Sequence, residues 1–183
     1  MILATSCKNI EIDESVVDLS HFVSKPITKF GEVIVDEEER KSLVNTDKFK
    51  IKIYPDEPLP FNINLDDNEW EILAYKEGGF FNKHKDRKRF EGHKYTALLY
   101  LPSNYTGGEV IFYDYSQVQY SLNNIDRPYL LIFDINMSHE SLPVTSGVKF
   151  VFKTAVLSYD DRVERECESD VYYNFHNTEG LED

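Results

Sequence analysis

The pattern between residues 70 and 159 limits the fold of this chain more than any other sequence feature. Short apolar or alternating segments follow one another there, and each is closed by Gly, Pro, Asn or Asp. Such segments are typical of antiparallel strands. Seven of them in about 90 residues predict a sandwich or jelly roll. The expected strands cover 70–75, 79–84, 95–101, 108–113, 129–133, 137–142 and 149–159.

The residues before and after this region give weaker signals. Between 11 and 23, apolar residues recur at roughly helical spacing and predict a short helix, while Ile51 and Ile53 alternate as in a strand. We therefore expect a mainly β fold with a small N-terminal α/β layer. Residues 160–183 hold nine acidic residues against two arginines, a composition typical of a solvated tail. The predicted division is a supporting layer of the same domain at 1–69, a β-strand core at 70–160 and an acidic tail at 161–183.

Length and charge exclude several classes of protein. A chain of 183 residues suits one domain. Its net charge of −13 repels phosphate backbones, which disfavours nucleic acid as a partner. The two cysteines, Cys7 and Cys167, form no disulfide framework and no zinc motif. Without a signal-peptide pattern or a run of membrane-spanning length, we expect a soluble, intracellular protein of the cytoplasm or nucleus that does not bind membranes.

A possible metal site begins at His84 and Asp86. Residues two apart on a strand point to one face, so this imidazole and this carboxylate can approach one ion together. The pair alone also fits an exposed strand end. His139 follows the apolar segment 129–133, and two His with one carboxylate form the facial triad of non-haem Fe(II) oxygenases. A lone His139 would more often be a hydrogen-bonded core residue.

Lys149, ten residues after His139, lies in an otherwise apolar and aromatic strand. A cation is costly to bury there unless a fixed anion meets it, and the carboxylate of a cosubstrate would be such an anion. A lysine whose stem lies along the rim of the barrel is the plainer explanation. Lys153 has the same strand parity and is the second candidate for this role.

Four stretches in this order resemble the catalytic domain of prolyl-4-hydroxylase-type, iron(II)- and 2-oxoglutarate-dependent dioxygenases. They are LAYKEGGFFNKHKD (73–86), TALLYLP (96–102), GGE (107–109) and HESLPVTSGVK (139–149). The resemblance covers about half of the chain, roughly residues 70 to 160. It implies a double-stranded β-helix that uses Fe(II), 2-oxoglutarate and O₂, with ascorbate as the reductant.

The resemblance also implies roles for individual residues. His84, Asp86 and His139 would hold the iron and so form the catalytic triad. Lys149 would bind the distal carboxylate of 2-oxoglutarate. Tyr100, in the Tyr-Leu pair of the family, would meet the same carboxylate, and Tyr75 is a weaker candidate for the cosubstrate pocket.

The implied reaction is oxidative decarboxylation of 2-oxoglutarate to succinate and CO₂, coupled to hydroxylation of a protein side chain, with a prolyl residue as the leading candidate. A protein or peptide is therefore the expected partner. One alternative is a nucleic-acid demethylase on the same fold, because a basic run surrounds the first metal motif: Lys83, Lys85, Arg87, Lys88, Arg89 and Lys94. A second alternative is a non-catalytic binding module. The identity of the substrate and the oligomeric state stay open.

Overall fold

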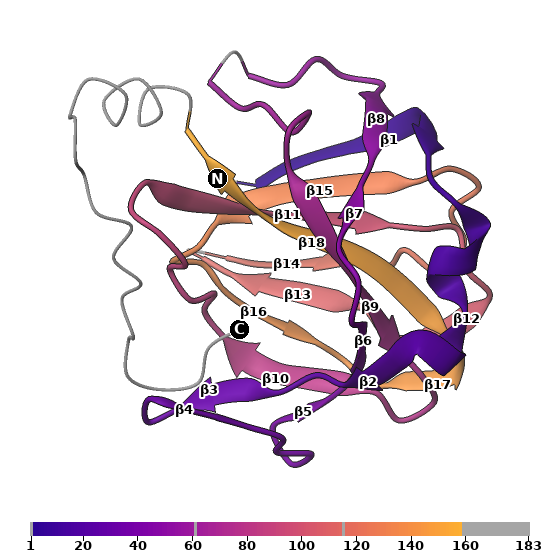
Figure 1. The fold of residues 1–183 in the computed structure, drawn as a ribbon, viewed down its shortest axis with the longest axis vertical. Helices are drawn as coiled ribbons and strands as arrows, with labels where there is room; N and C mark the ends of the chain where they lie inside the picture. Colours follow the sequence, from indigo (N-terminus) through magenta and orange to yellow (C-terminus); the bar gives the residue numbers. More distant parts are fainter. Residues whose placement is uncertain (1, 61, 115, 159–183) are drawn as a thin grey trace.

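The computed structural model describes residues 2–60, 62–114 and 116–158, which form two facing β-sheets and two separate two-stranded sheets (Figure 1). Nine strands of the described chain make the larger sheet. Eight of them lie in the order β2 (Phe22–Ser24), β6 (Leu43–Asn45), β9 (Glu69–Tyr75), β18 (Lys149–Leu157), β11 (His93–Tyr100), β15 (Tyr129–Asp134), β1 (Ile2–Glu11) and β8 (Lys52–Pro55). The ninth, β7 (Phe49–Lys50), pairs with β9.

The smaller sheet has five strands in the described residues. Their order is β14 (Gln117–Tyr120), β13 (Val110–Tyr113), β16 (Ser138–Ser141), β10 (Phe80–His84) and β5 (Arg40–Lys41). One hairpin joins β3 (Ile27–Lys29) to β4 (Glu32–Ile34), and β12 (Tyr105–Gly107) pairs with β17 (Val144–Gly147). Two facing antiparallel sheets make a jelly roll, so the prediction of a mainly β jelly roll is confirmed.

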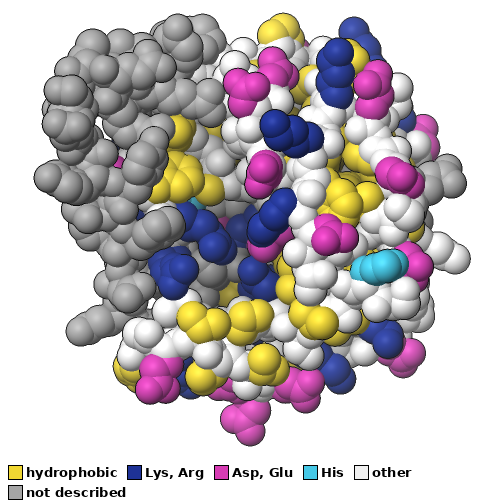
Figure 2. All heavy atoms as spheres, viewed as in Figure 1, with side chains coloured by type: hydrophobic (Ala, Val, Ile, Leu, Met, Phe, Trp, Pro, Cys, Tyr) yellow, Lys and Arg dark blue, Asp and Glu magenta, His cyan; other side chains and the backbone are white. Residues whose placement is uncertain are grey.

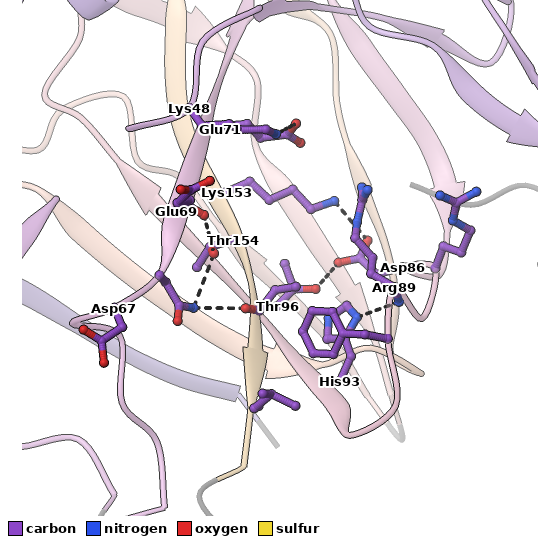
Figure 3. Close-up of a pocket in the computed structure, with 15 residues that line it drawn as sticks. Lys48, Asp67, Glu69, Glu71, Asp86, Arg89, His93, Thr96, Lys153 and Thr154 are labelled. Carbon is purple, nitrogen blue, oxygen red and sulfur yellow. Dashed lines mark hydrogen bonds and ion pairs between the residues drawn. The ribbon is translucent and has the colours of Figure 1, made fainter. Parts of the chain in front are cut away.

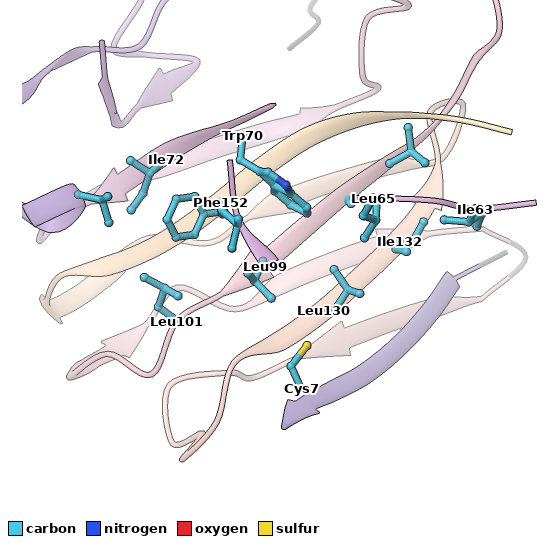
Figure 4. Packing of buried hydrophobic residues seen from close by; sticks show 14 residues of the cluster. Cys7, Ile63, Leu65, Trp70, Ile72, Leu99, Leu101, Leu130, Ile132 and Phe152 are labelled. Atoms are coloured by element: carbon cyan, nitrogen blue, oxygen red, sulfur yellow. The ribbon is translucent and has the colours of Figure 1, made fainter. Parts of the chain in front are cut away.

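Both faces of the larger sheet are buried, and strand alternation decides which side chain goes to which face. On β15, Leu130 and Ile132 join a cluster on the outer face, whereas Leu131 and Phe133 join a cluster between the sheets. The outer cluster includes Trp70 and is shown in Figure 4. Burial on both faces explains why the sequence of this strand is a continuous apolar run.

The same alternation sends charged residues between the two sheets. Val151 of β18 belongs to the inner cluster, and Lys149 and Lys153 share its parity. Across the pairing with β9, Lys149 lies opposite Tyr75 and Lys153 lies opposite Glu71. The inner row of β18 therefore carries two buried lysines into the space between the sheets.

The N-terminal α/β layer is not found in this form. All seven strands predicted between 70 and 159 are present, and β8 occurs where Ile53 suggested a strand. The helix expected at 11–23 is wrong: the chain forms two short 3₁₀ turns, Glu14–Val17 and Leu19–His21, and the rest of the layer is strand and loop.

Local hydrogen bonds explain the missing helix. The carboxylate of Asp13 accepts from the backbone N–H of Ser15 at 2.9 Å, and Asp18 does the same for Ser20 at 3.0 Å. Such bonds compete with the helical backbone pattern.

Two further expectations concern the C-terminal tail and membrane-spanning segments. The acidic tail predicted at 161–183 lies outside the described residues. In the part of the chain that is described, no helix has the length and apolar character needed to cross a membrane.

Candidate metal centre and adjoining cavities

An irregularity in β10 positions the first histidine. Phe81 pairs with Ser141 and His84 pairs with His139, so β10 takes three steps where β16 takes two. This extra residue is a β-bulge, a feature common beside active sites. In a regular strand Phe81 and His84 would face opposite sides. The bulge puts them on one side, where their rings stack with centroids 3.5 Å apart.

The structure brings the three predicted metal ligands together. The Oδ1 atom of Asp86 lies 3.6 Å from Nε2 of His84 and 3.4 Å from Nε2 of His139. One ligand atom from each residue lies within 4.8 Å of the other two. All three side chains are buried. His84 and His139 come from neighbouring strands as a cross-strand pair, and Asp86 follows the end of β10.

Hydrogen bonds leave the metal-facing atoms available. Nδ1–H of His84 donates to the carbonyl of Asn82 at 2.7 Å, and Nδ1–H of His139 donates to that of Met137 at 3.0 Å. A carbonyl only accepts, so both Nε2 atoms keep a lone pair. Thr96 donates to Oδ2 of Asp86, while Oδ1 is buried without a hydrogen bond from any described residue. Two imidazole nitrogens and one carboxylate oxygen therefore converge on one point, a donor set that fits Fe(II).

The protonation states also suit a metal. Burial lowers the pKa of His139 to about 3, and burial lowers the pKa of His84 as well. Burial alone would raise the pKa of Asp86, but Lys153 and the two imidazoles together hold it well below its usual value. Neutral imidazoles beside an ionised carboxylate are the forms that bind a cation.

A narrow inner cavity adjoins the two histidines. It measures about 30 Å³, and all four residues predicted to bind the cosubstrate line it: Tyr75, Tyr100, Lys149 and Lys153. The ammonium of Lys149 donates to the carbonyl of Gly108 at 2.9 Å and to Oγ of Ser141, and it lies 4.3 Å from the ring centre of Tyr75. Burial lowers the pKa of Lys149 to about 7, so an anion bound here would stabilise its charged form.

A second cavity of about 360 Å³ lies on the other side of Asp86 (Figure 3). Its lining is strongly charged, with Glu71 and Lys153 from the larger sheet and Arg87 and Arg89 from the loop after β10. Figure 2 shows Lys and Arg side chains gathered around a hollow on this side of the molecule. Part of the basic run noted in the sequence therefore lies at the entrance to the metal centre.

Sequence reasoning missed several residues of this region. Arg40 of β5 is buried, lines the inner cavity, and holds its guanidinium carbon 4.2 Å from the ring centre of Phe81. It follows the acidic run 36–39, where nothing in the sequence marked it as a site residue. Thr96 and Glu71 were also missed. A polar residue on the inner row of an apolar strand was the signal that could have identified Thr96.

Comparisons with known proteins find one matching family model and several similar folds. Residues 70–156 match the model of the 2OG-Fe(II) oxygenase superfamily. The chain is similar in fold to a prolyl-4-hydroxylase from Pseudomonas putida, with a TM-score of 0.55, 14% identity, and coverage of 86% of this chain and 92% of that one.

Two further solved structures give lower TM-scores. An oxidoreductase of the 2OG-Fe(II) oxygenase family from Burkholderia pseudomallei gives a TM-score of 0.47 at 10% identity, covering 75% of this chain and 74% of that one. A prolyl hydroxylase from Trichoplax adhaerens gives 0.41 at 23% identity, covering 56% and 47%. No curated protein matches the sequence. Residues 70–156, just under half of the chain, are therefore similar to the 2OG-Fe(II) oxygenase superfamily.

Proposed function

We propose that this chain is a dioxygenase that hydroxylates a protein side chain, with a prolyl residue as the leading candidate, and that it releases succinate and CO₂ from 2-oxoglutarate. One observation carries the proposal above the others. Oδ1 of Asp86 is buried and accepts no hydrogen bond from the described chain: the ammonium of Lys153 stays 3.6 Å away, and two imidazole nitrogens with free lone pairs face the same oxygen. Burying such an oxygen is costly unless a cation binds it.

His84, Asp86 and His139 hold the iron in this proposal. Bound iron with 2-oxoglutarate supplies the chemistry that inserts one oxygen atom of O₂ into a C–H bond. The protein holds the ligands in place. The carbonyls of Asn82 and Met137 orient the two imidazoles, and the hydroxyl of Thr96 orients the carboxylate. Three protein ligands would leave coordination positions for the cosubstrate and O₂.

Lys149 binds the distal carboxylate of 2-oxoglutarate. Its side chain is 1% exposed, and Tyr75 and Ser141 hold the ammonium inside the inner cavity. Tyr100 lies on the same cavity wall and its hydroxyl is the second donor for that carboxylate. Burial raises the pKa of Tyr100 well above its usual value, so the hydroxyl keeps its proton and can donate.

The cavity of about 360 Å³ is where the protein substrate enters. It reaches Asp86 and Thr96 at its floor, and Arg87 and Arg89 line it. Lys48 and Lys153 also line it, beside the carboxylates of Asp67, Glu69, Glu71 and Asp86. This mixed lining on an acidic molecule favours a peptide over a polyanion. The prolyl assignment rests on the sequence motifs, which resemble prolyl-4-hydroxylases, and on the shared fold with the P. putida prolyl-4-hydroxylase.

The test incubates purified protein with Fe(II), ascorbate and 2-oxoglutarate and measures succinate, first alone and then with candidate proline-containing peptides. Mass spectrometry should detect the gain of one oxygen on a peptide only when 2-oxoglutarate is present. Iron-loaded protein that forms no succinate under any condition would support a non-catalytic binding module instead. If methylated nucleic acid is turned over and no peptide is hydroxylated, the substrate is a nucleic acid and not a protein.

A further inference from the structure

Three neighbouring strands form the floor of the outer cavity, the one of about 360 Å³ beside Asp86. β18 lies between β9 and β11: Lys153 of β18 pairs with Glu71 of β9, and Ala155 pairs with Thr96 of β11. Neighbouring strands are about 4.8 Å apart, so β9 and β11 are roughly 10 Å apart. An extended peptide rises about 3.3 Å per residue, and the width of the floor therefore corresponds to about three residues.

Some of the charges that line this cavity are already paired within the protein. Oε2 of Glu71 accepts from Lys25 at 3.1 Å and from Lys48 at 3.2 Å. The ammonium of Lys153 lies 3.6 Å from Oδ1 of Asp86, the oxygen assigned to the metal. These groups largely neutralise one another, which leaves recognition of a substrate to the other charged residues of the lining.

The four other charged residues of the lining are separated by sign. Asp67 and Glu69 lie on the side of β9, are exposed, and form no ion pair with any described residue. Arg87 and Arg89 belong to the loop between β10 and β11, and Figure 3 shows Arg89 across the cavity from the two carboxylates. Arg87 is held by a 2.9 Å hydrogen bond to Oγ1 of Thr28, a hydroxyl that does not neutralise its charge. The cavity is therefore acidic on one side and basic on the other.

Separated charges select a substrate that carries both signs. The two sides are roughly 10 Å apart, and the screening length at physiological salt is about 8 Å, so each substrate charge responds mainly to the side that it faces. A segment with two like charges would be attracted on one side and repelled on the other. A nucleic-acid strand, negative throughout, would meet the carboxylates of Asp67 and Glu69.

We propose that the outer cavity binds an extended protein segment that carries a basic residue on one side of the target residue and an acidic residue on the other. Asp67 and Glu69 bind the basic residue, and Arg87 and Arg89 bind the acidic one. This inference rests on the proposed function and narrows its substrate class. Because a peptide chain has a direction, one order of the two charges binds better than the reverse.

Four peptides test this selection. Each has a central proline flanked by one charged residue on either side: Lys then Glu, Glu then Lys, two Lys, or two Glu. Calorimetry on protein loaded with Mn(II) and 2-oxoglutarate measures their binding, so no turnover is needed. One of the two mixed peptides should bind about tenfold or more tightly than each of the other three.

Charge reversal should change the preferred peptide in a defined way. With Asp67→Lys and Glu69→Lys together, both sides of the cavity are basic, and the peptide with two Glu should bind best. Adding Arg87→Glu and Arg89→Glu restores the net charge of the chain and exchanges the two sides. This fourfold variant should prefer the mixed peptide with the opposite order of charges from that preferred by the wild type.

Two further variants control for net charge and for local damage. Glu11→Lys with Asp126→Lys makes the same change in net charge at exposed residues outside the cavity, and it should keep the wild-type ranking of the four peptides. Asp67→Asn with Glu69→Gln removes the two charges without reversing them. In this variant the preferred mixed peptide and the peptide with two Glu should bind alike.

Several results would overturn the inference and leave the proposed function standing. They are equal affinity for all four peptides, binding of none of them to a protein that forms succinate, and an unchanged ranking when Asp67 and Glu69 are reversed. If the Mn(II)-loaded wild-type protein binds no 2-oxoglutarate, the proposed function itself fails, and the inference fails with it.

Discussion

At the scale of single residues, hydrogen bonds within the protein hold the three proposed metal ligands in place. Each histidine gives one ring nitrogen to a backbone carbonyl and keeps the other for the shared point beside Asp86. The sequence could predict His84, Asp86 and His139 because their types and spacing carry the chemistry. It could not predict Arg40, whose importance depends on a strand pairing that brings it beside Phe81.

Removing one ligand should abolish iron-dependent succinate formation and leave the fold intact. We expect this for His84→Ala, Asp86→Ala and His139→Ala, because two remaining ligands no longer define the open side of the metal. Succinate assays and circular dichroism of each variant check it. His21→Ala changes an exposed histidine and serves as control. A triad variant that keeps iron and near-normal turnover would show that the triad is wrongly assigned.

Lys149→Ala should raise the concentration of 2-oxoglutarate needed for turnover. The loss of a charge-assisted contact in a buried pocket typically costs about 2–5 kcal/mol. Lys149→Arg should be milder, because it keeps the positive charge. Steady-state kinetics with varied 2-oxoglutarate measure the effect. A larger increase in Lys153→Ala than in Lys149→Ala would transfer the distal contact to Lys153.

His93 should make the protein sensitive to acid. It is 3% exposed, accepts from the backbone N–H of Arg89 at 3.1 Å, and donates to the carbonyl of Tyr95 at 3.0 Å. Burial lowers its pKa to about 4, against 6.5 in the unfolded chain. The unfolded state therefore takes up a proton first as the pH falls, and stability decreases between about pH 6.5 and 4 by up to about 3 kcal/mol.

Urea unfolding at several pH values measures this slope. In His93→Gln the slope over the same range should be smaller, although the variant is less stable at neutral pH. An unchanged slope would show that other groups cause the acid sensitivity.

Glu71 should cause a further loss of stability at lower pH. Burial would raise the pKa of Glu71, but Lys25, Lys153 and Lys48 lower it to about 2. The stability that ionised Glu71 contributes is therefore lost as the pH falls from about 4.5, its ordinary pKa, to about 2.

At the scale of elements, the strands of the core were predictable and the N-terminal region was not. The strands between 70 and 159 are apolar runs closed by turn residues, a pattern that depends only on nearby sequence. Short strands such as β5 and β6 are formed by pairing with β10 and β9, which are distant in sequence. The bulge in β10 was equally invisible, since it is defined by the register against β16.

Gly147, at the end of the β12–β17 pair, should tolerate no side chain. Its φ is +77°, and a Cβ atom would lie 2.1 Å from the carbonyl oxygen of Asn104. Gly147→Ala should therefore destabilise the protein more than backbone strain alone, which costs about 1–3 kcal/mol. Gly31 has a similar φ of +79° with nothing within 4 Å of its Cβ position, so Gly31→Ala isolates the strain. Equal urea midpoints for the two variants would contradict the steric argument.

At the scale of the whole molecule, charge is unevenly distributed. The chain carries −13 overall, whereas in the cavity beside Asp86 four cations, Arg87 and Arg89 among them, balance four carboxylates. Reversing the charges of Arg87, Lys88 and Arg89 to Glu should slow association with an acidic peptide, with an effect that fades as salt rises. Succinate formation without peptide should stay unchanged.

Stopped-flow association at several salt concentrations measures this effect. Reversal of three exposed lysines elsewhere, Lys8, Lys50 and Lys52, gives the same change in net charge and is the matched control. Equal rates for both reversed variants would show that only net charge matters. If the variant with reversed charges at Arg87, Lys88 and Arg89 hydroxylates peptides as well as the wild type does, these three residues have no role in binding the substrate.

The cross-strand pairing of His84 with His139 has a consequence for how the chain folds. A slip of one residue between β10 and β16 would turn one imidazole to the opposite face of the sheet, because side chains alternate along a strand. Only correctly aligned molecules could then bind the ion, and binding would shift the population to them by mass action. The metal would thus select molecules in which the two strands are correctly aligned. The metal-loaded fraction of a preparation would then report the fraction of molecules that had folded in register.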